Sequence, residues 1–83
     1  MLNDFTIIGT IIKIENEIVT IASVRDYKNE NGFYEHDIIP ITIHGIDISK
    51  FEFGDRICVK GTMQNVDCKK PVVLQAKKIH WLA

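Results

Sequence analysis

The chain has 83 residues, of which 46% are hydrophobic and 25% charged, and its formal net charge is −1. These values predict a single globular domain over residues 1–83 and exclude an intrinsically disordered chain. They also exclude a polycation, so any polyanionic partner must meet a local basic patch. No segment approaches the roughly 20 apolar residues of a membrane span, and no secretion signal begins the chain. We therefore expect a cytoplasmic protein with no membrane partner.

Five stretches rich in β-branched residues predict five short β-strands separated by turn-forming residues. The first stretch is interrupted by Gly9, at a point where a strand would bulge or bend sharply. A tight turn is expected at Glu15-Asn16. Five strands in so short a chain favour an all-β, five-stranded barrel over an α/β domain. The expected strands are Asp4–Ile14, Glu17–Arg25, Glu35–His44, Asp55–Gln64 and Pro71–Trp81.

Alternation of side chains predicts which faces of these strands point inward. The inward side carries Ile39, Ile41 and Ile43 in the third strand and Ile57, Val59, Gly61 and Met63 in the fourth. Pro40 donates no backbone hydrogen bond, so the third strand should have a free edge or a bulge there. The second strand is apolar on both sides. Either Val19, Ile21 and Ser23 face inward, or Ile18, Ala22 and Val24 do. Its other face would then suit contact with another subunit.

The connections between strands carry most of the remaining signals. Gly45–Gly54 contains four large apolar residues and is expected to form a short helix or a loop that plugs one barrel end. The residues 26–34 contain Tyr27, Phe33 and Tyr34 next to Lys28. Rings in a polar hairpin suit stacking on the bases of a flat ligand while cations meet its phosphates. The alternative is that these rings fold back onto the sheet.

No pattern of catalytic or metal-binding residues is found. Cys58 and Cys68 are expected to be free thiols, and together with the three histidines they have no zinc-site spacing. A glycine-rich phosphate loop and a Ser/His/Asp set are both missing. Asp55 follows Gly54 and is best explained as a turn residue. We therefore expect neither enzymatic activity nor a cofactor or metal.

Seven segments of the chain follow one another in the order of a known family: Met1-Leu2-Asn3, Ile8-Gly9, Val24-Arg25, Gly32, Asp37–Gly45, Gly54–Gly61 and Ala76–Leu82. In this order they resemble the bacterial single-stranded-DNA-binding protein (SSB) family, whose fold is the oligonucleotide/oligosaccharide-binding (OB) barrel. The third-strand segment and its glycine are also similar to primosomal replication protein B, which has the same fold. The resemblance implies an OB barrel that binds single-stranded DNA and assembles as a homodimer or homotetramer. It also implies a nucleoid-associated protein of DNA replication, recombination or repair.

The chain departs from the family pattern at several positions. The connection Gly45–Gly54 is short, and so is Asn65–Lys70, which in the family is a long hairpin with a stacking aromatic. Ile38 and His44 stand where the family has aromatic residues in the third strand. The family's acidic tail, which recruits replication and repair enzymes, is also missing, so we expect no recruitment by that route.

The candidate DNA-binding residues follow from the aromatic hairpin and from the resemblance. Tyr27 lies near the family's base-stacking position, while Phe33 and Tyr34 are further stacking candidates, one of which could instead pack under the hairpin. His44 would stack on or hydrogen-bond to a base, unless it is simply a solvated strand end. Trp81 is expected in the core or in a subunit interface. The candidates for phosphate contacts, each of which could instead be merely solvated, are Arg25, Lys28, Arg56, Lys60, Lys69 and Lys70.

The sequence thus predicts a protein that binds single-stranded DNA with little sequence preference, along the exposed faces of the second, third and fourth strands. RNA would be bound by the same stacking and stays an alternative ligand. A rival of a different class is an OB module that binds other proteins of a replication complex. The near-neutral charge and the absent aromatics favour that rival, whereas the aromatic hairpin favours DNA.

Overall fold

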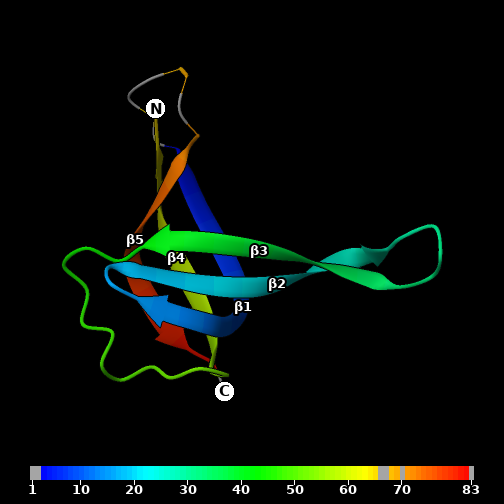
Figure 1. Cartoon of the computed structure of the whole chain (residues 1–83), viewed down its shortest axis with the longest axis horizontal. Helices are drawn as coiled ribbons and strands as arrows, with labels where there is room; N and C mark the ends of the chain where they lie inside the picture. The colour runs from blue at the N-terminus through cyan, green and yellow to red at the C-terminus, as the bar shows by residue number, and fades with distance from the viewer. Residues whose placement is uncertain (1–2, 66–67, 70, 83) are drawn as a thin grey trace.

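In the computed structural model, which describes residues 3–65, 68–69 and 71–82, the chain forms a closed five-stranded barrel (Figure 1). Around the barrel the strand order is β1-β2-β3-β5-β4, and β4 closes onto β1. All pairs are antiparallel except β3 and β5, which meet through Thr42 and Gln75. This is the predicted all-β OB-fold barrel. The strands are β1 (Asp4–Glu15), β2 (Ile18–Lys28), β3 (Tyr34–Thr42), β4 (Arg56–Gln64) and β5 (Val73–Trp81).

β1 serves both halves of the barrel. Its residues Asp4–Thr10 pair with β4, and Thr10–Glu15 pair with β2. Gly9 lies where the strand changes partners, and a Cβ atom there would be 2.6 Å from the carbonyl oxygen of Ala22. Only glycine permits that approach. The irregularity expected at Gly9 is therefore a close crossing of strands, and the register shift itself lies two residues later, beyond Ile11.

A second close crossing joins β4 to β5. The register shifts between Lys60 and Gly61, so that Lys78 pairs with Lys60 and Ala76 pairs with Gly61. Lys77 is the extra residue of this β-bulge. A Cβ atom on Gly61 would lie 2.0 Å from the carbonyl oxygen of Gln75, so the bulge requires glycine at this position.

Each strand contributes one or two inward-facing residues to the core, and one further core residue follows directly after β3. These buried residues are Ile11, Val19, Ile21, Ile41, Ile43, Ile57, Val59 and Ala76. The ambiguity of β2 is thereby decided, because Val19 and Ile21 are fully buried while Ile18 and Val24 are exposed. Met63, predicted to face inward, is 39% exposed because β4 has passed the end of the core there.

The connection between β3 and β4 is a loop, and none of its residues is helical. Ile46, Ile48 and Phe51 pack against the core, so the loop does cover one end of the barrel. Phe53 instead is exposed. Asp55 acts as the predicted turn residue, because its carboxylate accepts a hydrogen bond from the Glu52 N–H at 2.9 Å.

The ends of β2 and β3 leave the barrel together as a long hairpin, seen at the right of Figure 1. Both strands run further into this hairpin than predicted, to Lys28 and from Tyr34. Among the described residues, the edge of β3 away from β2 has no strand neighbour along most of its length, since β5 meets it at Thr42. This confirms the free edge predicted from Pro40. In the described ranges no helix is long and apolar enough to cross a membrane.

Candidate nucleic-acid interface

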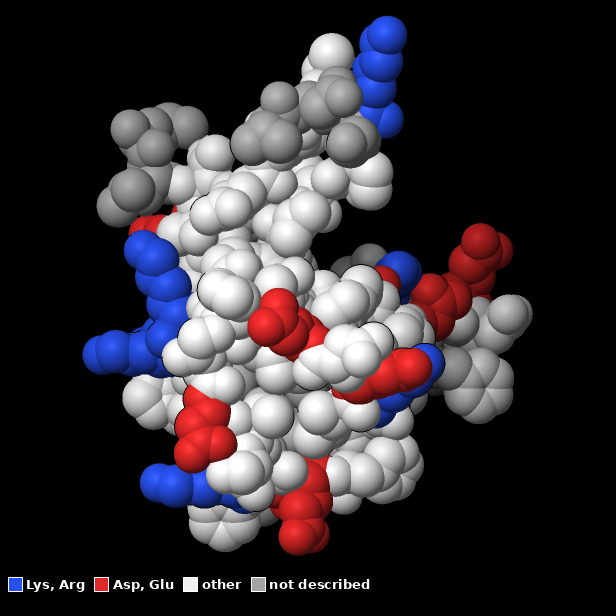
Figure 2. Space-filling model, turned by 60° about the vertical axis from the view of Figure 1, so that its left-hand side comes forward, with Lys and Arg blue, Asp and Glu red and all other residues white. Residues whose placement is uncertain are grey.

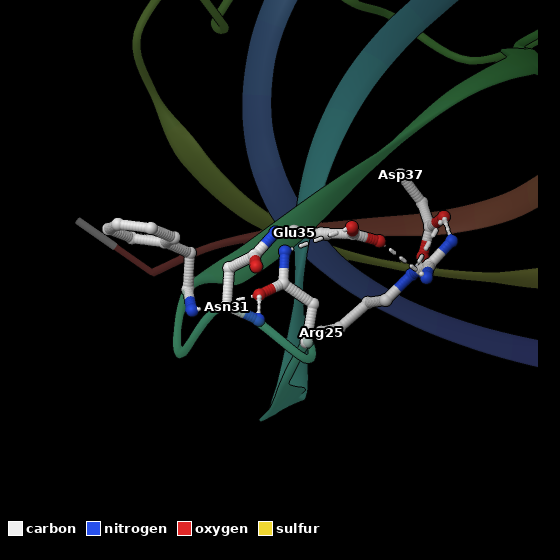
Figure 3. A network of polar contacts seen from close by, with 6 residues as sticks. Arg25, Asn31, Glu35 and Asp37 are labelled. Atoms are coloured by element: carbon white, nitrogen blue, oxygen red, sulfur yellow. Dashed lines mark hydrogen bonds and ion pairs between the residues drawn. The ribbon is translucent and has the colours of Figure 1, made fainter.

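A network of polar side chains holds the projecting hairpin in shape (Figure 3). The Arg25 guanidinium donates to the carboxylate of Asp37 at 2.8 Å and to that of Glu35 at 2.9 Å. The Asn29 amide nitrogen donates to the other carboxylate oxygen of Glu35 at 3.1 Å. The side-chain amide oxygen Oδ1 of Asn29 in turn accepts a hydrogen bond from the Phe33 N–H at 3.0 Å, which closes the hairpin loop. The network therefore links the base of the hairpin to its tip.

This network changes the role expected for Arg25. Hydrogen bonding to Asp37, reinforced by the charge of Asp37, raises the pKa of Arg25, and the same bonding lowers the pKa of Asp37. The predicted phosphate contact of Arg25 stays a prediction, but its guanidinium already has two carboxylate partners. Glu35, Asp37 and Asn29 were missed by sequence reasoning. The pattern that could have indicated them is a set of acidic residues opposite an arginine across the hairpin. This pattern can be recognised only once the register between the two strands is known.

The lowered pKa of Asp37 predicts a pH dependence of stability. A carboxyl whose pKa is lower in the folded than in the unfolded protein stabilises the fold at pH values above its unfolded-state pKa. This stabilisation is lost as the pH falls through the folded-state pKa. We therefore expect Asp37→Asn to destabilise the protein near neutral pH and to destabilise it less at about pH 3, below the ordinary pKa of an aspartate. Urea unfolding at both pH values measures this difference. Asp26→Asn is the control, and an equal loss for Asp37→Asn at both pH values would contradict the prediction.

All three hairpin rings are exposed. The exposed fractions are 59% for Tyr27, 69% for Phe33 and 52% for Tyr34. The alternative in which the rings fold back onto the sheet is therefore wrong, and neither Phe33 nor Tyr34 packs under the hairpin. Lys28 lies directly opposite Tyr34, with its Nζ 5.7 Å from the ring centroid. A lysine beside an open ring suits a ligand with bases and phosphates.

Two pairs of neighbours define the surroundings of the rings. Lys28 and Tyr34 are cross-strand neighbours, so their side chains lie on the same face of the hairpin. Tyr27 precedes Lys28 within the stretch where the register with β3 is irregular, so alternation does not fix the face of its ring. The charge of Tyr27 contributes to the raised pKa of Arg25, so Tyr27 lies close to that guanidinium. Each tyrosine of the hairpin therefore has a basic side chain beside it.

The outer face of the β2–β3 ribbon continues from the hairpin toward the barrel. It is aliphatic rather than aromatic: Val24 is 56% exposed and Ile38 is 59% exposed, with Ala22 directly opposite Ile38. Ile38 is the position at which the SSB family has a ring. This face can therefore offer apolar contact to bases, although without the stacking of an aromatic side chain.

His44 lies at the far end of this ribbon from the hairpin. Its Nδ1 is 3.3 Å from both carboxylate oxygens of Glu17, and the two side chains are 74% and 69% exposed. About nine residues of β3, at about 3.3 Å each, separate His44 from the aromatic hairpin by about 30 Å. The structure does not bring His44 and Tyr27 together, and any phosphate contact of His44 would compete with Glu17.

The phosphate candidates of β4 lie elsewhere on the barrel. β4 is flanked by β1 and β5, so a groove over contiguous strands two, three and four does not exist. A hollow of about 440 Å³ instead links β2 to β4 across β1, with Val24, Ile8 and Arg56 in its lining. Lys60 lies further along the outer face of β4, opposite Thr6 of β1.

The remaining candidates lie in or near the connection between β4 and β5. Lys69 and Cys68 are exposed in a turn of this connection, and Lys70 lies outside the described residues. Cys58 and Cys68 are free thiols. Trp81, expected in the core or an interface, is not in the core, since 64% of it is exposed. Within the described ranges no group of three His, Cys, Asp or Glu side chains is arranged to hold a metal ion.

Solved structures with the same fold are found for this chain. Mitochondrial single-stranded DNA binding protein Rim1 of S. cerevisiae aligns over 99% of this chain and 96% of its own, with a TM-score of 0.76 and 18% identity. The dimeric N-terminal domain of PriB from Thermoanaerobacter tencongensis aligns over 98% and 97%, with a TM-score of 0.57 and 18% identity. No family model and no curated protein matches the sequence. The resemblance to the SSB and primosomal proteins is thereby confirmed at the level of the OB fold.

Proposed function

We propose that this protein binds single-stranded DNA with little sequence preference, as a cytoplasmic, non-enzymatic factor of DNA replication, recombination or repair. The observation that carries the proposal is the projecting hairpin, which holds Tyr27, Phe33 and Tyr34 exposed beside Lys28. Buried aromatic residues would serve the fold, but exposed ones on a fixed hairpin serve a ligand with flat faces. The likeness of the barrel to Rim1 supports the same proposal.

The protein should bind oligo-dT and bind duplex DNA of the same length much more weakly. Paired bases cannot stack on hairpin rings, whereas unpaired bases can. With two to four phosphate contacts, the slope of log affinity against log salt should be about −1.5 to −3, taking about −0.7 for each contact on single strands. Fluorescence anisotropy at several salt concentrations measures both quantities. Oligo-rU in the same titration decides between DNA and RNA. Equal affinity for duplex and single strand would overturn the proposal.

We also propose that the protein self-associates, as at least a dimer. The edge of β1 over Asp4–Gly9 that faces β2 has no strand pairing within the part of the chain that the structure describes. The contact described there is the hydrogen bond that the Ser23 hydroxyl donates to the Ile8 carbonyl at 2.7 Å. An open strand edge next to exposed Ile8 and Val24 suits antiparallel pairing with β1 of a second copy. The dimeric PriB domain, with the same fold, supports this assembly.

Light scattering should therefore show a particle of at least twice the 9.5 kDa monomer mass at micromolar concentration. Ile8→Lys places a charge on the outer face next to the open edge and should shift the protein toward monomer. Thr42→Lys, on β3 away from this edge, is the control. A monomeric wild type would refute the assembly.

A second function, protein binding within a replication complex, is favoured by one specific observation. The outer face of β2 and β3 exposes Val24 and Ile38, where aliphatic side chains replace rings. Exposed aliphatic surface of this kind suits a protein partner as well as a base. If oligo-dT and oligo-rU both fail to bind while the protein forms a complex with a replication protein through Ile38, this second function replaces the first.

A further inference from the structure

Three lysines gather on the outer face of β4 and β5, remote from the aromatic hairpin. Lys60 and Lys78 are direct cross-strand partners, and Lys77 is the additional residue of the bulge beside them. All three are exposed and line one shallow hollow of about 360 Å³. In Figure 2 several lysine and arginine side chains stand along the left margin of the molecule and others lie at its top and right, while acidic side chains spread over the face toward the viewer. We call Lys60, Lys77 and Lys78 the basic strip.

The strip carries uncompensated positive charge. Like charges placed directly opposite each other in a sheet repel, so the Lys60–Lys78 pair works against folding. In the described part of the chain none of the three lysines has an ion-pair partner, although Lys13 and Arg25 do. Of the described acidic residues, Asp4 alone lines the same hollow. In a chain whose net charge is −1, this concentration of charge is a specific local feature.

The neighbours of the strip indicate which polyanion it suits. Thr6 lies opposite Lys60 on one side, and Thr62 and Gln75 pair with each other further along the same two strands. Threonine, glutamine and lysine side chains are typical donors to phosphate oxygens. The centres of protein interfaces are instead depleted in lysine and enriched in aromatic residues. A phosphate backbone therefore fits this surface better than an acidic protein does.

The strip also stays accessible in the proposed dimer. The free edge of β1 lies on its β2 side, whereas β4 and β5 lie on the opposite side of β1. Pairing through that edge would leave the outer face of β4 and β5 uncovered.

We propose that the basic strip is a second binding surface, which takes the backbone phosphates of a single strand long enough to extend beyond the hairpin. This proposal rests on the proposed single-strand binding, and it assigns phosphate contacts to Lys77 and Lys78, which sequence reasoning did not single out. The hairpin supplies stacking, and the strip supplies charge without base contacts. The binding of short strands and the binding of long strands should therefore depend on different residues.

The test compares the double variant Lys77→Ala/Lys78→Ala with the wild type on two oligo-dT ligands. One has about 8 nucleotides, within the site size of a single OB fold, and one has about 30, well beyond it. The double variant should bind the short ligand like the wild type. On the long ligand its salt slope should be smaller in magnitude by about 1.4, or about 0.7 for each lysine lost. Lys13→Ala/Lys50→Ala makes the same change in charge elsewhere and should leave both titrations unchanged.

Protection of lysines from acetylation, measured by mass spectrometry, gives a second readout on the unmodified protein. The long ligand should protect Lys60, Lys77 and Lys78, and the short ligand should not. If the short ligand binds and the double variant still matches the wild type on the long one, the strip is overturned while the proposed function stands. If the wild type binds neither ligand, the proposed function itself is wrong. Binding of polyglutamate, lost in the double variant while oligo-dT binding is kept, would assign the strip to acidic proteins instead.

Discussion

Replacing Tyr27 by alanine is expected to weaken oligo-dT binding by about 1–3 kcal/mol, the usual contribution of one stacking platform. The ring is 59% exposed, so its loss removes a ligand contact and leaves the core untouched. The melting temperature of the variant should therefore stay close to that of the wild type. Anisotropy titration at constant salt measures the loss.

Two further variants separate stacking from other roles of this side chain. Tyr27→Phe keeps the ring and should keep most of the affinity. If Tyr27 instead acted through a hydrogen bond from its hydroxyl, this variant would lose affinity as well. Ser49→Ala in the loop between β3 and β4 is a control for nonspecific effects, since Ser49 bonds only to its neighbour Asp47 among the described residues. If Tyr27→Ala binds as tightly as the wild type, the hairpin is not the nucleic-acid interface.

Replacing Ile41 by alanine should lower the free energy of unfolding by about 2–5 kcal/mol, the range for a large-to-small change in a packed core. Ile41 has no exposed surface and lies in the cluster shared by all five strands. A domain of this size has a total stability of only about 5–12 kcal/mol, so the variant should lose a large share of it. Urea unfolding followed by circular dichroism measures the change.

Ile38 provides a matched control three residues earlier in the same strand. It is the same residue type but 59% exposed on the outer face, so Ile38→Ala should change stability by less than about 0.5 kcal/mol. The same variant tests the outer face of the β2–β3 ribbon as a ligand surface. Similar destabilisation by both variants would mean that the outer face is covered in solution, as it would be in a subunit interface.

The hairpin residues show most clearly what could be predicted from the sequence and what depends on the tertiary structure. Three rings in a polar segment were enough to predict that they either stack on a ligand or fold back onto the sheet, and the structure decided for exposed rings. Their placement beside Lys28 and Arg25 was not predictable. It depends on the irregular register between Val24 and Lys28, which is fixed by pairing with β3 and by the bonds of Arg25 to Glu35 and Asp37.

The sequence by itself determined the five strands, their inward faces in β3 and most of β4, and the barrel they form. These properties follow from alternation and turn residues, which act over a few neighbours in the chain. Tertiary structure alone decided which face of β2 is buried, because both faces are apolar and only closure of the barrel selects one. It also decided that β4 lies between β1 and β5, so that Lys60 meets Lys77 and Lys78 instead of the hairpin. Contacts between residues distant in sequence depend on strand order and register, and local patterns do not encode either of them.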